Sequence, residues 1–173
     1  IEDGKTVTLN GSGMLVYYDK PTTGSTAVTQ TLAGVSLGNG STLVVAAAAD
    51  QAAEIGAVEG ESGDFRVESG SLTVKGNVKV ADLTVEAGSL TLGAAAEGAD
   101  AYAITAATLD VRADAVVSAA ANSLTLTGGS NADFTAEKHY ANVNTVAGSL
   151  AVKTLETAQD LLVTGTAQID TLK

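Results

Sequence analysis

Apolar and polar residues alternate in short runs along most of this chain, which is the pattern of half-buried β-strands. The clearest runs are VESGSLTV at residues 67–74 and VEAGSLTL at residues 85–92. The second run nearly repeats the first eighteen residues later, and each has a Gly-Ser step between two strand-like halves. A strand, a corner and a second strand that recur at this distance predict one turn of a coil of strands.

The repeat reads Φ-x-Φ-x-x-G-x-Φ-x-Φ, where Φ is an apolar residue. Its copies begin at Val7, Val35, Phe65, Leu83, Leu109 and Val143, with the clearest at Phe65 and Leu83, and a weaker copy at the end contains Leu162, Gly165, Ala167 and Ile169. The copy at Leu109 is degenerate, because Asp114 stands where the glycine is expected. The unequal intervals between copies indicate coils of constant cross-section that are joined by loops of variable length.

A Gly-Ser step at the same offset marks four of the copies. The steps are Gly40-Ser41, Gly70-Ser71, Gly88-Ser89 and Gly148-Ser149. A tight corner between two strands often requires a positive φ angle, which glycine adopts without steric cost. We therefore expect these glycines to lie at corners in that conformation.

These patterns predict an all-β protein, a parallel β-helix (β-solenoid) of about seven or eight coils. We expect a single elongated domain over residues 1–173, with an N-terminal cap or docking region at 1–34 and solenoid coils at 35–173. The residues expected to face inward are Val67, Leu72, Val74, Leu83, Val85, Leu90, Leu92, Leu109, Val111, Leu150 and Val152.

Two other local structures fit parts of the pattern. Gly76-Asn77 is typical of a two-residue hairpin loop, which would favour an antiparallel β-sandwich as the alternative fold. The segment AAAADQAAEIGAVE at 46–59 is rich in good helix formers and is compatible with one short helical insertion.

The composition limits which side chains can fill the core and which partners the protein can bind. Aromatic residues are only 3% of the chain and hydrophobic residues are 45%, so the core must consist of small aliphatic side chains. The net charge of −11 disfavours binding to the phosphate backbone of nucleic acids. The longest apolar run, 43–49, is far shorter than the roughly 20 residues of a membrane-spanning helix, so we expect no membrane insertion.

Strands such as GSLTV, ADLTV, GSLTL and TAQIDTL, rich in Thr, Ala and Gly, resemble those of bacterial surface β-solenoids. The passenger segments of autotransporters and the filamentous adhesins are the group that the chain looks like, over most of residues 35–172. The resemblance implies a parallel β-helix at the cell surface or outside the cell. The pattern of a C-terminal barrel is missing, and the chain begins with Ile1, which suggests a processed or excised passenger.

Residues suited to catalysis are few. His139 is the only histidine, and its polar neighbours in AEKHYAN at 136–142 favour an exposed loop residue. No serine lies in a G-x-S-x-G motif, and the acidic loop at 59–64 does not match a calcium-binding loop. We therefore predict no enzyme activity, no catalytic or metal-binding residues and no cofactor. A carbohydrate-binding or polysaccharide-degrading β-helix is the alternative.

The two ends of a solenoid are the places where it can bind another subunit, because each end exposes a strand edge and a slice of core. The candidate docking residues are Met14, Leu15, Val16, Tyr17, Tyr18, Ile169 and Leu172. The expected function is that of a building block of a bacterial surface fibre or adhesin. Its partners would be further copies, joined head to tail, or a receptor on a host or cell surface.

Overall fold

The structure is a computed structural model, and it describes residues 5–11, 13–17, 31–47, 52–131 and 142–173. The described residues contain β-strands and no helix. In chain order the strands are β1 (Thr6–Leu9), β2 (Met14–Tyr17), β3 (Thr31–Leu37), β4 (Thr42–Ala46), β5 (Ala52–Gly60), β6 (Asp64–Ser69), β7 (Ser71–Val74), β8 (Val78–Leu92), β9 (Ala103–Leu126), β10 (Asn144–Val146), β11 (Ser149–Thr157), β12 (Leu161–Val163) and β13 (Thr166–Leu172).

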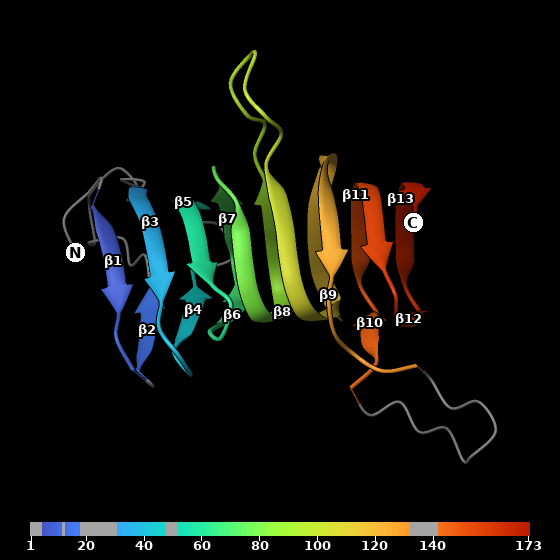
Figure 1. Ribbon diagram of the computed structural model, residues 1–173, viewed down its shortest axis with the longest axis horizontal. Helices are drawn as coiled ribbons and strands as arrows, with labels where there is room; N and C mark the ends of the chain where they lie inside the picture. The colour runs from blue at the N-terminus through green and yellow to red at the C-terminus, as the bar shows by residue number, and fades with distance from the viewer. Residues whose placement is uncertain (1–4, 12, 18–30, 48–51, 132–141) are drawn as a thin grey trace.

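All pairings between the described strands are parallel. A strand in the first half of the chain pairs with the strand two positions further on: β1 with β3, β2 with β4, and β3 with β5. The strands therefore follow one another along the long axis, with the N-terminus at one end and the C-terminus at the other (Figure 1). The protein is all-β, as expected, and its parallel arrangement is solenoid-like.

The eighteen-residue repeat is confirmed, because residues at the same position of the two copies pair with each other in adjacent strands. Leu72 pairs with Leu90 in the next strand, and Phe65 pairs with Leu83. All the residues expected to face inward are buried, and they belong to one continuous hydrophobic cluster. Equivalent side chains thus stack directly on one another through the molecule, which lets small aliphatic residues fill the interior without aromatic volume.

The early copy that begins at Val35 is in phase with the copy at Val7, as predicted, but not with the copy at Phe65. The residue that pairs with Phe65 from the preceding turn is Leu43, whereas Val35 pairs with Val7 and Val58 on another side of the molecule. The reason is that one turn of the chain contains more than two strand segments, and similar alternation occurs in each. The pattern alone does not distinguish which side a given segment occupies.

For the degenerate copy that begins at Leu109, the prediction is correct in the first half and is off by one residue in the second half. The pairing between β8 and β9 shifts register after Val85, so that Val117, and not Val116, pairs with Leu90. Val117 is 1% exposed and Val116 is 43% exposed. An extra residue of this kind is a β-bulge, and it reverses the side of every residue that follows.

The late copy is also shifted in its first half. Thr145 pairs with Asp110, and Val146 pairs with the buried Val111, so Val146 and not Thr145 takes the inward position, while Val143 is buried (8% exposed) as its apolar place in the repeat predicts. Asn144 is fully buried, which the apolar pattern does not predict.

The glycine corners are confirmed in three of four cases. Gly40, Gly70 and Gly88 have φ angles of 70°, 80° and 78°. Gly148 is not among the glycines with a positive φ. A side chain there would overlap the backbone oxygens of Arg112 and Ala115, so Gly148 is required by close packing between successive turns and not by its φ angle.

The helix considered within 46–59 is wrong for the part of it that the structure describes, because residues 52–60 form β5. Ala53 and Ile55 are buried and pair with Leu72 and Val74, and this packing outweighs their helix propensity. Gly76-Asn77 does not close a hairpin either, because the strands on both of its sides, β7 and β8, pair in parallel with β5.

Candidate functional site

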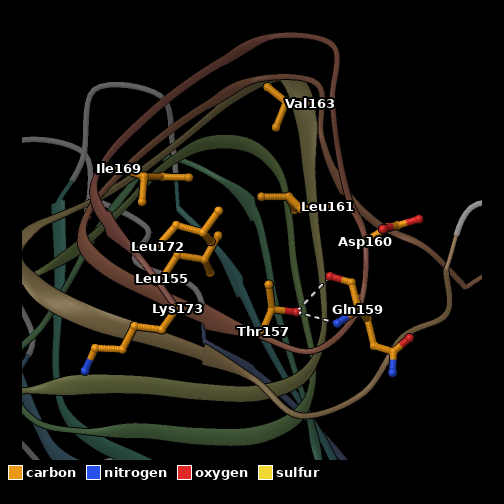
Figure 2. Close-up of a pocket in the computed structure, with 9 residues that line it drawn as sticks. All are labelled: Leu155, Thr157, Gln159, Asp160, Leu161, Val163, Ile169, Leu172 and Lys173. Carbon is orange, nitrogen blue, oxygen red and sulfur yellow. Dashed lines mark hydrogen bonds between the residues drawn. The ribbon is translucent and has the colours of Figure 1, made fainter.

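A hollow with a volume of about 510 Å³ lies at the C-terminal end of the molecule. Its lining comes from the last three strands and the turns beside them (Figure 2). The lining residues are Leu155, Thr157, Gln159, Asp160, Leu161, Val163, Ile169, Leu172 and Lys173. Two of the predicted docking residues, Ile169 and Leu172, are therefore brought together here.

The interior of this hollow is apolar. Leu155, Leu161, Ile169 and Leu172 point toward one another in Figure 2, while the amine of Lys173 points away. Leu172 is 68% exposed and Val163 is 40% exposed, and these are two of the three exposed large hydrophobic residues in the described part of the chain. The end of the hydrophobic core is thus open to solvent at this point, where burial of its surface by another strand layer would be favourable.

The strand edge beside the hollow is open as well. Among the described strands, β13 pairs only with β11, and β12 pairs only with β10. The ladder is regular up to the last residue, because the Lys173 amide donates a hydrogen bond of 2.9 Å to the Leu155 oxygen. The outer edge therefore presents backbone N–H and C=O groups that a further parallel strand can pair with.

A local turn shapes the rim of the hollow. The Thr157 hydroxyl donates a hydrogen bond to the Gln159 backbone oxygen (3.0 Å) and accepts one from the Gln159 amide (3.1 Å). These two bonds close the turn between β11 and β12, which are the strands that carry Leu155 and Leu161. The Thr157 side chain therefore closes the turn at the rim, between the strands that line the hollow.

Four of the other predicted docking residues, Met14 to Tyr17, lie at the opposite end of the molecule (Figure 1). Met14–Tyr17 form β2, which pairs with β4 through Leu15 with Leu43 and Tyr17 with Val45. Tyr18 lies outside the described residues. The two predicted groups therefore form two separate ends and not one site.

One column of residues connects the two ends. Each member pairs with the next across adjacent strands, and all members between the first and the last are fully buried. The column consists of Tyr17, Val45, Val67, Val85, Val111, Val146 and Val163. It begins on the edge strand β2 and ends on the edge strand β12 beside the hollow.

Three asparagines hold the loops that leave this core, and the repeat pattern did not point to them; Asn122 and Asn144 are buried, and Asn77 is exposed. The Asn122 amide donates to the Tyr102 oxygen (3.0 Å), and Asn77 accepts from the Ala103 amide (3.0 Å), so both hold the base of the projecting loop 93–102 (Figure 1). Asn144 donates to the Gly128 oxygen (3.2 Å) at the base of the next loop. Loops fixed at their bases on a rigid core are common places for recognition.

Ion pairs form a ladder along one outer side of the coil. Glu86 lies between Arg66 (3.9 Å) and Arg112 (3.3 Å), which project from successive strands. Each of these side chains is substantially exposed, so the pairs contribute little to stability. Glu61 pairs with Lys79, and the hydrogen bond and charge of that lysine lower the pKa of Glu61.

We find no arrangement suited to metal chemistry in the ranges that the structure covers, since no three His, Cys, Asp or Glu side chains are grouped to hold a metal ion there. His139 lies outside these ranges. The same ranges contain no helix that is long and apolar enough to span a membrane.

The open apolar end is therefore the feature best suited to binding. A partner could pair with its strand edges and bury its exposed apolar side chains. Comparisons of the chain with protein-family models, with curated proteins and with solved structures find no match.

Proposed function

We propose that this protein is a non-enzymatic structural module, a parallel β-helix of about seven or eight coils that stacks head to tail with further copies of itself. The observation that carries the proposal is the apolar hollow at the C-terminal end, bordered by the outer edges of β12 and β13, with which no other described strand pairs. The module would serve as a building block of a bacterial surface fibre or adhesin.

The number of coils is supported by the column that starts at Tyr17 and ends at Val163. It has seven members, one for each turn of the chain, and each is paired with its neighbour in parallel. A chain that pairs valine with valine from Val45 to Val163 already repeats the kind of contact that a second copy would make. Assembly requires only that this contact be made once more between molecules.

The two ends have complementary polarity. Because all described pairings are parallel, the N-terminal edge of one copy can continue the ladder at the C-terminal edge of another without changing strand direction. In that arrangement Tyr17 of the second copy would follow Val163 of the first. A contact between two different surfaces of this kind does not close on itself, so it propagates into a filament.

The location outside a bacterial cell rests on the resemblance of the strands to those of surface β-solenoids. The projecting loop 93–102 supports the adhesin part of the proposal, because it stands away from the coil on a base held by Asn77 and Asn122 (Figure 1). A fibre of stacked modules would display this loop at regular intervals along its length, which favours multivalent binding to a cell-surface receptor.

The test compares two exposed hydrophobic residues in sedimentation velocity experiments. Leu172 lies at the open end, and Val116 lies on the side of the coil. We expect the unmodified chain to form larger species as its concentration rises, Leu172→Asp to remain monomeric, and Val116→Asp to assemble like the unmodified chain. A monomeric unmodified chain at all concentrations, or equal assembly of both variants, would refute the proposal.

A further inference from the structure

Two Asn-Gly steps occupy successive turns of the chain and differ in how their backbones are held. Asn10-Gly11 lies between β1 and β2, and Asn39-Gly40 lies between β3 and β4. The two corners are adjacent, because the Gly38 amide donates a hydrogen bond of 2.7 Å to the Leu9 oxygen. Asn-Gly is the sequence most prone to cyclise, since glycine has no Cβ to hinder attack by its own backbone nitrogen.

The backbone nitrogen of Gly40 is engaged. Its N–H donates a hydrogen bond of 2.9 Å to the Ser62 oxygen of the next turn. The Ser41 amide donates to the Gly38 oxygen (3.1 Å), and Gly40 has a φ of 70°, which together describe a type II turn. The buried Ser41 hydroxyl adds a second bond to the Gly38 oxygen, at 2.7 Å. The Gly40 nitrogen therefore cannot approach the Asn39 side chain unless this corner opens.

The corner at Asn10 has no such restraint. Both Asn10 and Gly11 are exposed, and the Gly11 N–H donates no hydrogen bond to the part of the chain that the structure describes. The space where a Gly11 side chain would lie is empty to 4 Å. Among the described strands, β1 pairs only with β3, so this corner has a neighbouring turn on one side and Asn39 has one on each side.

We propose that Asn10 is a site of spontaneous deamidation in the folded protein and that Asn39 is protected. The Gly11 nitrogen attacks the Asn10 side-chain carbonyl carbon, a bond forms between them, and ammonia leaves, which produces a five-membered succinimide. Water then adds to either carbonyl of this ring and yields aspartate or isoaspartate. The net change replaces an amide and a water molecule with a carboxylate and ammonium, and it needs no enzyme or oxidant.

Deamidation would change the corner beside the N-terminal edge. It adds one negative charge, and the isoaspartate product also inserts an additional backbone carbon between β1 and β2. Both changes alter the edge that carries β1 and β2, whereas the same reaction at Asn39 would occur inside the stack of turns.

The test is to incubate the folded chain at mildly alkaline pH and to quantify both peptides by mass spectrometry. We expect deamidation at Asn10 to be at least about tenfold faster than at Asn39, which corresponds to an opening free energy of about 1.4 kcal/mol at the second corner. In concentrated urea the two rates should become similar. The variant Asn10→Gln should abolish the early mass increase and leave the slow reaction at Asn39.

Two results would overturn the proposal. The first is equal deamidation of Asn10 and Asn39 in the folded chain, since the hydrogen bond from Gly40 to Ser62 would then offer no protection. The second is an Asn10 rate that rises in urea as much as the Asn39 rate does, since the Asn10 corner would then be restrained to the same degree.

Discussion

The backbone amide of Leu109 donates a hydrogen bond of 2.9 Å to the side-chain oxygen of Asn144, which lies one turn further along the coil and is fully buried. The Asn144 amide donates in turn to the Gly128 oxygen (3.2 Å), where the chain leaves the core for a long loop. One asparagine thus satisfies two backbone groups that the strand ladder leaves open at the base of this loop.

The first prediction concerns this asparagine. Replacing Asn144 with leucine keeps a similar volume but leaves the Leu109 amide and the Gly128 oxygen without their partner. We expect a loss of about 1–3 kcal/mol in the free energy of unfolding, measured by urea denaturation. The control is Asn131→Ala, at an exposed asparagine of the same loop, which should leave the midpoint unchanged. Equal stability of Asn144→Leu and the unmodified chain would show that the bond is dispensable.

A second prediction tests the register shift in β9. Val117 is buried beside Leu90, and its neighbour Val116 faces solvent. Val117→Ala should lower the free energy of unfolding by about 2 kcal/mol, because two methyl groups leave a packed core, while Val116→Ala should change it by less than about 0.5 kcal/mol. If Val116→Ala were the more damaging of the two, the shift would be wrong.

A third prediction separates two glycines that share a positive φ angle. Gly98 has a φ of 82° and open space around it, so Gly98→Ala should cost only the conformational penalty of about 1–2 kcal/mol. At Gly88, with a φ of 78°, an added Cβ would also overlap the Gly70 oxygen. Gly88→Ala should therefore cost about 1–3 kcal/mol more. Thermal unfolding of both variants provides the measurement, and equal losses would argue against close stacking of the corners.

A fourth prediction concerns pH. Burial, and then the charge of Asp82, raise the pKa of Asp64 above its ordinary value of 3.8, against smaller opposing effects of the Asp82 amide and of Arg66. Ionised Asp64 therefore destabilises the fold at neutral pH, and this cost disappears as the pH falls through the folded-state pKa. Asp64→Asn should raise the melting temperature near neutral pH, and the gain should shrink as the pH falls through the raised pKa of Asp64 and be lost by a pH of about 3.8.

The control for the pH experiment is Asp170→Asn, at an exposed residue on β13. This substitution at an exposed position should leave the melting temperature at neutral pH unchanged. A destabilised Asp64→Asn at neutral pH would mean that the hydrogen bond from the Asp82 amide outweighs burial.

The part of the fold that the sequence predicted well is the region where the repeat has no insertion. From Phe65 to Leu92 the repeat is eighteen residues long and in phase, so each apolar residue could be assigned to its side of the strand. The prediction was wrong where a bulge adds one residue, as before Val116, because alternation with a period of two records no change of phase. The similarity among all strand segments likewise hid one partner of Val35, which is Val58, although its pairing with Val7 agrees with the copies that begin at these two residues.

The candidate site was predicted only in outline. Ile169 and Leu172 were identified from the strand pattern near the C-terminus, and they do line the open end. Leu155, Leu161 and Val163 were missed, because their place around the hollow depends on how the described strands pair and not on their neighbours in sequence. Asn122 and Asn144, the buried asparagines that hold the bases of the loops, were missed for a related reason. A polar residue in an alternating run is normally placed outside, and its burial becomes visible only with the loop that it holds.

Electron microscopy of the negatively stained, purified chain at two concentrations tests the central claim, that the coil stacks end to end, most directly. We predict fibres of uniform width that become longer at the higher concentration, as expected for a contact that does not close. Separate short particles of the same size at both concentrations would contradict it.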